Sequence, residues 1–371
     1  MRILHCLRAP IGGLFRHVLD LAGEQARRGH DVGLLTDSTV QNALTSVQFA
    51  EIAPLLTLGV ARIPISRQPG LGDYKAARAT LDHASPLNLD VLHGHGAKGG
   101  AYARLARRAL RAQGQPVQAF YTPHGGTLNY RPGTAQSTVL LSLERVLERF
   151  TDGLIFESAY AARVYCERVG NGPAPQRVIH NGLRPGDFMA HTPEPDATDF
   201  LFIGELRPIK GVGHMLDALA QLNERSPVTA TIVGSGPEEA KLKAKTAELG
   251  LQDSLRFTGA LPARTALSLG RTMVVPSLAE SFPYVVLEAA AAGVPLISTD
   301  VGGIPEITAG TDSELIPPAS VPALVKAMRE CLDHPEAAAQ RAQRLKDNVA
   351  SKFTVSAMAD AVLAFYALRD A

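Results

Sequence analysis

The sequence contains no tryptophan and few other aromatic residues, since aromatic side chains make up only 5% of its 371 residues. Single-stranded nucleic acids are bound largely by stacking bases on aromatic side chains, so a stacking surface is not expected. An excess of charge of one sign is also missing, because 37 basic and 36 acidic residues leave a formal net charge of +1. Such a protein has no general attraction for a phosphate backbone. Nucleic acid is therefore disfavoured as a partner.

Cysteines and long apolar runs are also scarce. Cys6, Cys166 and Cys331 are odd in number, lie far apart and form no CxxC pattern. This usage predicts buried thiols in a reducing compartment, not a disulfide framework. No apolar run approaches the length of a membrane span, and the N-terminus lacks the features of a signal peptide. We therefore expect a cytoplasmic location.

The length of the sequence and the order of its apolar segments indicate two domains. A chain of 371 residues with 46% hydrophobic and 20% charged residues is long enough for two cores. Strand-like and helix-like segments alternate throughout, which predicts parallel sheets covered by helices. In the first half, strands are expected at 2–6, 30–36, 91–93, 117–122, 154–158 and 178–180, and helices at 14–28, 99–112 and 137–150. In the second half, strands are expected at 200–204, 228–233, 254–258 and 294–298, and helices at 211–223, 237–249 and 283–292.

A stretch rich in proline and polar residues, 184–198, separates these halves. We place the domain boundary there, which gives Rossmann-like domains at 1–185 and 186–350 and a closing helical segment at 351–371. Residues 40–75 are proline-rich, and we expect them to be irregular. Ligands of open parallel sheets bind at the carboxyl ends of the strands, so a site is expected where both domains present these loops.

The stretch from Pro276 to Glu306 narrows the chemistry most. Glu280 precedes an alanine-rich helical segment and Glu288 lies inside it, with seven residues between them. A helix N-terminus offers free N–H groups, and carboxylates accept hydrogen bonds from sugar hydroxyls. From the spacing alone, a helix cap and a solvated glutamate explain the pair as well as a sugar site does.

This stretch resembles the Glu-x7-Glu region of family 4 retaining glycosyltransferases. The shared features are Ser-Phe-Pro after the first glutamate, Glu-Ala-Ala at the second, Gly-Val-Pro at the helix exit and Gly-Gly-Ile-Pro-Glu beyond it. The resemblance implies that Glu280 binds the donor sugar and Glu288 the ribose. It also implies backbone contacts to the sugar or diphosphate at Ser281, Phe282, Pro283 and Tyr284. The implied fold is GT-B: two Rossmann-like domains face each other across a cleft, and the last helix crosses back to the first domain.

A second motif, IGELRPIKGVGHML, places Arg207 and Lys210 between a strand and a helix. Two cations at a helix N-terminus suit a diphosphate and its growing negative charge. Alone, the motif would more readily be a basic surface turn, but beside the glutamate stretch diphosphate binding is favoured. The family commonly has Arg directly after the strand-end glycine, where Glu205 stands here. Arg207 is therefore assigned as a substitute, whereas Lys210 matches directly.

Three glycine-containing loops complete the predicted donor site. VGSGPEE, with Gly234 and Gly236, lacks the third glycine of a dinucleotide fingerprint but resembles a nucleotide-side loop of the family. FTGALP, with Leu261, resembles the family segment that lies against the base. Gly12 and Gly13 stand at the first strand-to-helix turn, where the family's Gly-Gly pair approaches the diphosphate, with His17 one turn later. From the residues alone, each of these loops would be interpreted as an ordinary turn.

Several histidines are candidates for the part of the site that holds the transferred sugar and the acceptor. His124, in YTPHGG, matches a family position that contacts the transferred sugar, in a supporting and not a proton-transferring role, although a lone histidine is more often structural. His93 and His95, in HGHGAKGG, are two residues apart and share a face of a strand. These two histidines could bind one metal ion, but no third ligand is evident in the sequence, so no metal is expected. His95 and Lys98, together with His17, are assigned to the acceptor side of the cleft.

The following helix carries Arg104, Arg107, Arg108 and Arg111 at positions i, i+3, i+4 and i+7, with Leu105 and Ala109 able to face the core. A solvated helix face is the ordinary interpretation. Peripheral attachment to the inner face of an anionic membrane is the alternative, and it would suit an acceptor linked to a polyprenyl diphosphate.

Together the resemblance implies a metal-independent retaining glycosyltransferase without a cofactor. It would move a hexose-type sugar from a nucleoside diphosphate sugar to a hydroxyl of a glycan or polyprenyl-linked glycolipid in the synthesis of exopolysaccharide or lipopolysaccharide. A sugar-nucleotide 2-epimerase, which needs no acceptor, and a non-catalytic nucleotide-sugar-binding protein remain alternatives. An NAD-dependent dehydrogenase is disfavoured by the incomplete glycine fingerprint. The base, sugar, acceptor and linkage stay open.

Overall fold

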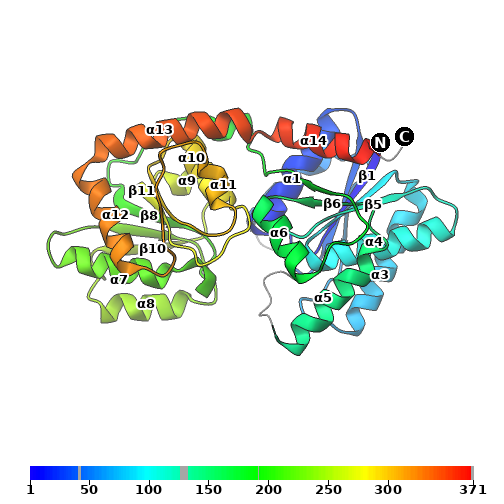
Figure 1. Ribbon diagram of the computed structural model, residues 1–371, viewed down its shortest axis with the longest axis horizontal. Coiled ribbons are helices and arrows are strands. Elements are labelled where there is room, and N and C mark those ends of the chain that lie inside the picture. Colours follow the sequence, from blue (N-terminus) through cyan, green and yellow to red (C-terminus); the bar gives the residue numbers. More distant parts are fainter. Residues whose placement is uncertain (41–42, 126–132, 191, 369–371) are drawn as a thin grey trace. The chain divides into compact units, whose positions relative to one another are not determined.

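The computed structural model describes residues 1–40, 43–125, 133–190 and 192–368, which form two compact units (Figure 1). The first unit comprises Met1–Gly182 together with Val355–Ala371, and the second comprises Leu183–Thr354. Each unit is built around one parallel sheet with helices on its faces, as the alternation of strand-like and helix-like segments predicts.

The first unit contains a seven-stranded sheet in the order β3-β2-β1-β4-β5-β6-β7. Its strands are β1 (Arg2–Leu7), β2 (Asp31–Asp37), β3 (Gly59–Ile63), β4 (Val91–His95), β5 (Gln118–Thr122), β6 (Gly153–Phe156) and β7 (Gln176–Val178). Its helices are α1 (Gly12–Arg27), α2 (Ala43–Ile52), α3 (Leu71–Ala84), α4 (Gly96–Ala112), α5 (Ala135–Glu148), α6 (Ala159–Arg168) and α14 (Val355–Ala367). The apolar side chains of α14 are buried in one cluster with Phe120 and Ile155. The C-terminal helix thus returns to the first unit, which confirms the expectation for it.

The second unit contains a six-stranded parallel sheet in the order β10-β9-β8-β11-β12-β13. Its strands are β8 (Thr198–Ile203), β9 (Ala230–Val233), β10 (Leu255–Gly259), β11 (Gly270–Val275), β12 (Leu296–Thr299) and β13 (Leu315–Ile316). Its helices are α7 (Val212–Asn223), α8 (Glu239–Glu248), α9 (Ala263–Leu267), α10 (Tyr284–Ala292), α11 (Ile304–Thr308), α12 (Val321–Asp333) and α13 (Pro335–Lys352). The Rossmann-like expectation holds for both units.

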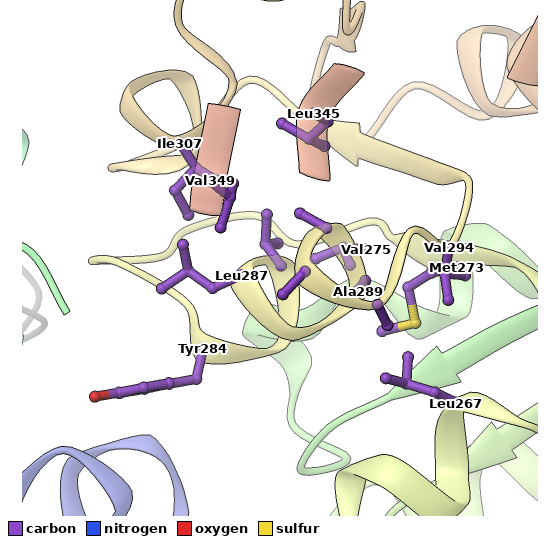
Figure 2. Close-up of a cluster of buried hydrophobic side chains, with 14 of the residues drawn as sticks. Leu267, Met273, Val275, Tyr284, Leu287, Ala289, Val294, Ile307, Leu345 and Val349 are labelled. Carbon is purple, nitrogen blue, oxygen red and sulfur yellow. The ribbon is translucent and has the colours of Figure 1, made fainter. Parts of the chain in front are cut away.

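Helix α10, which carries Glu288, is fixed in the core of the second unit. Its four alanines are small, so neighbouring elements approach it closely, and Gly293 ends it in the left-handed conformation with φ +76°. Figure 2 shows Leu287 and Ala289 of this helix among Met273 and Val275 of β11 and the side chains of α13. The position of α10 therefore depends on the packing of the whole unit.

Residues 40–75 are not irregular over the part described, because they contain α2, the 3-10 turn η1 (Ala53–Leu55), β3 and the start of α3. The sequence gives weak signals here for physical reasons. Helix α2 has no acidic residue in its first turn and no basic residue in its last. Strand β3 is a half-exposed edge strand that pairs only with β2.

The expectation of a solvated arginine face on α4 holds for Arg108 and Arg111, which are exposed, but is wrong for Arg104. Arg104 is fully buried, with its Nη2 2.8 Å from Glu144 Oε2 and its guanidinium over the Tyr121 ring, whereas Leu105 is 38% exposed. A cation can be buried in this way only because a carboxylate and an aromatic face compensate it.

The other arginines of α4 have partners as well. Arg107 donates two hydrogen bonds, of 2.9 and 2.6 Å, to the Asp152 carboxylate, and Arg111 lies 3.8 Å from the same group. The Arg108 guanidinium lies over the Phe150 ring. The helix therefore does not present the continuous cationic face on which the hypothesis of membrane contact depended. Among the described helices none is long and apolar enough to cross a membrane.

The cysteines differ in burial. Cys6 is completely buried, and burial raises the pKa of its thiol to about 12. Cys166 and Cys331 are only half-buried, so the expectation of three buried thiols holds for Cys6 alone. All three are free thiols.

Candidate functional site

In the second unit, the loops after β8 and β11 bring a lysine and a glutamate together. Lys210 ends the 3-10 turn η5 (Pro208–Lys210), and Glu280 stands between β11 and α10. Lys210 Nζ lies 2.7 Å from Glu280 Oε1, and the buried Ser277 hydroxyl donates to the same oxygen at 2.6 Å. The two charged side chains are 23% and 9% exposed, so the pair is partly buried. Sequence reasoning found the two charged residues but missed Ser277.

Glycines let these loops pack against each other. A Cβ on Gly211, whose φ is +67°, would lie 2.0 Å from the Pro276 carbonyl oxygen, and Leu278 N–H donates to Ile209 O across the same contact. A Cβ on Gly234, with φ +143°, would lie 1.8 Å from the Gly204 oxygen. A Cβ on Gly236 would lie 2.5 Å from the Leu206 oxygen. The glycines that the sequence assigned to close approach by a ligand thus also permit close approach between loops.

Arg207 lies on the same loop as Lys210 but faces solvent. It is 49% exposed, and its Nη1 is 3.7 Å from the Glu205 carboxylate, which is also exposed. The residue that replaces the family's arginine in the sequence is therefore the ion-pair partner of Arg207. Such an exposed pair is weak and leaves the guanidinium free to move.

The segment that follows Glu280 contributes backbone to the site and side chains to the core. The Ser281 carbonyl accepts a hydrogen bond from Gly303 N–H at 2.9 Å, which holds this loop against the Gly-Gly turn before α11. Phe282 and Tyr284 are buried, and the Phe282 ring packs edge-on against Phe353. Pro283 is the N-cap of α10.

Glu288 lines a pocket of about 300 Å³ in the second unit. The pocket is formed by residues from the 3-10 turn η4 (Pro185–Phe188), the chain just after it, α9 and α10. Arg264 brings a cation and Asp187 a second carboxylate to its walls. Leu261 is half-buried against the apolar core two residues before α9. The pocket therefore combines polar and apolar walls, as a nucleoside requires.

In the first unit, histidines from four segments meet at the carboxyl ends of β1, β4 and β5. His95 is central: its Nε2 lies 2.9 Å from His5 Nδ1, and its Nδ1 lies 3.1 Å from His124 Nε2. The His93 and His17 rings lie 4.0 and 5.6 Å from the His95 ring between centroids. We call His5, His17, His93, His95 and His124 the histidine cluster. Sequence reasoning named His93 but saw no third ligand beside it and did not consider His5.

The cluster is enclosed by neutral hydrogen-bond partners. His5 Nε2 lies 2.8 Å from Gln25 Oε1, and His17 Nδ1 lies 2.9 Å from Asn181 Oδ1. His93 lies between the Thr122 hydroxyl, at 2.9 Å, and the Tyr366 hydroxyl of α14, at 2.6 Å. His124 has a left-handed backbone with φ +49°, which is uncommon outside glycine and marks a position held by its surroundings.

Burial keeps the cluster uncharged. It lowers the pKa of His5 to about 4 and those of His17 and His124 to about 3. Burial, reinforced by the neighbouring histidines, lowers the pKa values of His93 and His95 as well. Charging any one imidazole would cost desolvation, and for His17 the Glu157 carboxylate offsets this cost only in part. The rings are therefore neutral at physiological pH.

His95, Lys98 and His124 line a second pocket, of about 270 Å³, with Arg8 and Arg67. Lys98 does not reach into it freely, because its ammonium donates to Asp73 at 2.6 Å and to the carbonyls of Ser66 and Gln68. Lys98 thereby anchors the loop that carries Arg67. Gly12 and Gly13 open α1 in the same unit, and Gly12 has φ +66°.

Comparison with known proteins gives matches over nearly the whole chain. The family model described as Glycosyltransferase Family 4 matches residues 11–186, and the model described as Glycosyl transferases group 1 matches residues 197–334. Glycogen synthase of Mycobacterium tuberculosis is 30% identical over 391 aligned positions, which cover 96% of this chain and 91% of that protein. D-inositol 3-phosphate glycosyltransferase of Kribbella flavida is 28% identical over 82% of this chain and 79% of its own.

Solved structures share the fold. Anabaena HepE in complex with UDP and glucose superposes with a TM-score of 0.82 at 19% identity, over 98% of both chains. Sucrose-phosphate synthase from Thermosynechococcus elongatus superposes with a TM-score of 0.79 at 20% identity, over 99% of this chain and 98% of that one. These likenesses agree with the GT-B arrangement of two parallel-sheet units.

Proposed function

The chain belongs to glycosyltransferase family 4, and from this premise we propose that it transfers a hexose-type sugar from a nucleoside diphosphate sugar to a hydroxyl of a glycan or glycolipid, with retention of the anomeric configuration. The observation that carries the proposal is the contact of 2.7 Å between Lys210 and Glu280. It joins a cation for a diphosphate and a carboxylate for a sugar at one end of one sheet.

Lys210 stabilises the charge that grows on the leaving diphosphate, and Arg207 adds a mobile second cation. Fixed positive groups that face a developing anion are among the largest contributions to catalysis. Because these side chains supply the charge, we propose that the transfer step needs no divalent ion. The backbone amides of Ser281, Phe282 and Tyr284, the backbone of Pro283, and the glycine loops at Gly12, Gly13, Gly234 and Gly236 complete the contacts with the diphosphate and the sugar.

Glu280 orients the donor sugar. Its Oε1 already accepts hydrogen bonds from Lys210 and Ser277, so Oε2 is the oxygen left for a sugar hydroxyl. Glu288 binds the ribose in its pocket, and the backbone near Leu261 lies against the base. We propose uracil as the base, since the HepE structure with the same fold holds UDP-glucose.

In the first unit, His124 contacts the transferred sugar and the pocket it shares with His95 and Lys98 receives the acceptor. His124 acts as a neutral hydrogen-bonding group, because burial lowers its pKa to about 3 and so keeps the ring uncharged at neutral pH. The acceptor is deprotonated with the help of the leaving phosphate. We propose a polyprenyl-linked or other cell-surface glycan as the acceptor.

A turnover assay tests this function. UDP-glucose, UDP-galactose, GDP-mannose and ADP-glucose are incubated with glycan and polyprenyl-glycan acceptors in the presence of a chelator, and the anomeric configuration of the product is read by NMR. We expect release of one nucleoside diphosphate that depends on the acceptor, with retention. Conversion of the donor sugar without an acceptor would identify an epimerase. Binding without any turnover would identify a non-catalytic binding protein.

A further inference from the structure

The hydrogen bonds around the histidine cluster determine where its protons lie. Gln25 Oε1 is an acceptor, so His5 donates to it from Nε2 and offers a lone pair at Nδ1. That lone pair, 2.9 Å from His95 Nε2, requires His95 to donate from Nε2. A neutral imidazole carries one N–H group, and His95 Nδ1 is therefore a bare lone pair.

His17 also carries a lone pair on one ring nitrogen, and a different hydrogen bond shows it. Its Nδ1 donates to Asn181 Oδ1 at 2.9 Å, so Nε2 carries a lone pair. The His17 side chain is 2% exposed, and Nε2 has no hydrogen-bond donor among the residues that the structure describes. Two buried lone pairs, on His95 and His17, thus face the same small volume.

His124 cannot satisfy both of them. Its Nε2 lies 3.1 Å from His95 Nδ1, and each of His17, His95 and His124 offers a nitrogen within 4.8 Å of the other two. One N–H of His124 can fill one lone pair, which leaves the other without a donor in a buried position. A buried acceptor without a partner is unfavourable, whereas a cation would bind all three nitrogens at once.

We propose that His17 Nε2, His95 Nδ1 and His124 Nε2 form a binding site for a divalent transition metal ion of the Zn²⁺ type. Three neutral imidazoles and one open position are a donor set that zinc takes in proteins. Zn–N bonds of ordinary length in a tetrahedral site separate the nitrogens by about 3.3 Å, close to the 3.1 Å between His95 and His124.

The surroundings of the three nitrogens fit this assignment. Metal-bound histidines usually donate their second N–H to a carbonyl, a carboxylate or another fixed acceptor, which sets the tautomer. His17 donates to the Asn181 amide oxygen, and His95 donates to His5, which donates to Gln25.

The site lies beside the proposed acceptor pocket, since His95 and His124 line that pocket. A water can therefore occupy the fourth position. The site lies within the first unit, whereas Lys210 and Glu280 lie in the second, and its presence does not depend on the proposed transferase activity.

Metal binding by untagged protein tests the proposal directly. The protein is treated with a chelator, dialysed and titrated with Zn²⁺ in a calorimeter and with Co²⁺ in an absorption spectrometer. We expect one ion per chain and the visible absorption of a tetrahedral Co²⁺ complex. His17→Gln and His95→Asn should each weaken binding at least tenfold, and Asn181→Ala should weaken it about 10-fold to 100-fold through the second N–H of His17.

His334→Asn serves as the matched control, because this histidine lies in the second unit at the start of α13. It should bind Zn²⁺ like the wild type. Circular dichroism checks that each variant folds, and a rise in melting temperature with Zn²⁺ in the wild type but not in His17→Gln gives a second readout. Failure to bind one equivalent of either ion, or binding that His17→Gln and Asn181→Ala leave unchanged, would overturn the proposal.

Discussion

The carboxyl ends of the two sheets hold their polar side chains in opposite ways. In the first unit, His5, His17, His93 and His95 of the histidine cluster are buried and come from segments far apart in the chain, and the pair of Arg104 and Glu144 is buried as well. In the second unit, Lys210 and Glu280 lie on two loops and remain partly exposed. Buried polar groups mainly determine stability, because each must keep its partner. Partly exposed groups at a strand end can give up contacts with solvent for contacts with a ligand.

The largest expected effect is on stability and concerns the first unit. Arg104→Ala leaves Glu144 as a buried carboxylate without its cation, and we expect the free energy of unfolding to fall by about 4 kcal/mol. Urea denaturation measures the change. Arg108→Ala, on the same helix but exposed, should cost less than about 1 kcal/mol. A loss for Arg104→Ala no larger than for Arg108→Ala would contradict the view that buried charges dominate this unit.

The next effect is on chemistry and concerns the second unit. Lys210→Ala removes the cation that faces the leaving diphosphate, so we expect kcat to fall about 10²-fold to 10³-fold while stability changes little. Steady-state kinetics and thermal unfolding measure the two quantities. Lys243→Ala is the control, since this lysine is exposed on α8, where it pairs with Glu239 and lies over the Phe257 ring. A variant that loses stability but keeps its kcat would make Lys210 a structural residue like Arg104.

A smaller effect should follow from Ser277→Ala. The hydroxyl donates to Glu280 Oε1 at 2.6 Å from a fully buried position, and its loss removes one of two hydrogen bonds that fix the carboxylate. Hydrogen bonds to charged groups contribute about 1.5 kcal/mol, which corresponds to roughly a tenfold rise in the donor KM. Ser277→Thr, which keeps the hydroxyl, should retain a lower KM than Ser277→Ala, and equal values for both would exclude this role.

The smallest effect is pH-dependent and concerns Asp73. Burial raises the pKa of this carboxyl, but hydrogen bonds from Lys98 and Tyr102 outweigh it and lower the pKa below its usual value. Its stabilisation is therefore present above the unfolded pKa and is lost as the pH falls through the lower folded value. We expect Asp73→Asn to cost about 1 kcal/mol at pH 7 and progressively less below pH 4. A cost that does not change with pH would mean that charge plays no part in this contact.

Lys210 and Glu280 could be found from the sequence although they are 70 residues apart, because each stands in a recognisable strand-to-helix loop. Lys210 lies just after a strand and Glu280 just before a helix, so the order of elements places both at one sheet end. The histidine cluster could not be predicted in the same way. His5 and His95 are 90 residues apart, and only the pairing of β1 with β4 brings them together. The spacing of His93 and His95 was the single local signal.

The arginines of α4 show a different limit. Their spacing correctly places them on related faces of a helix, but periodicity does not say which face meets the core. We predicted that the arginines face solvent. Arg104 is buried instead, because Glu144 of α5 and Tyr121 of β5 contact its guanidinium. Whether a helix arginine is buried depends on partner residues from other elements, and the sequence of the helix alone does not reveal them.

Nucleotide binding in the absence of metal tests the central claim most directly. UDP, GDP, ADP, their sugars and NAD are titrated in a calorimeter, with a chelator present, into wild type, Glu288→Ala and Glu248→Ala, an exposed control on α8. We predict that one nucleoside diphosphate binds, that Glu288→Ala weakens it at least tenfold, and that Glu248→Ala does not. Binding of none of them, or of NAD alone, would contradict the assignment of the second unit as a nucleotide-sugar site.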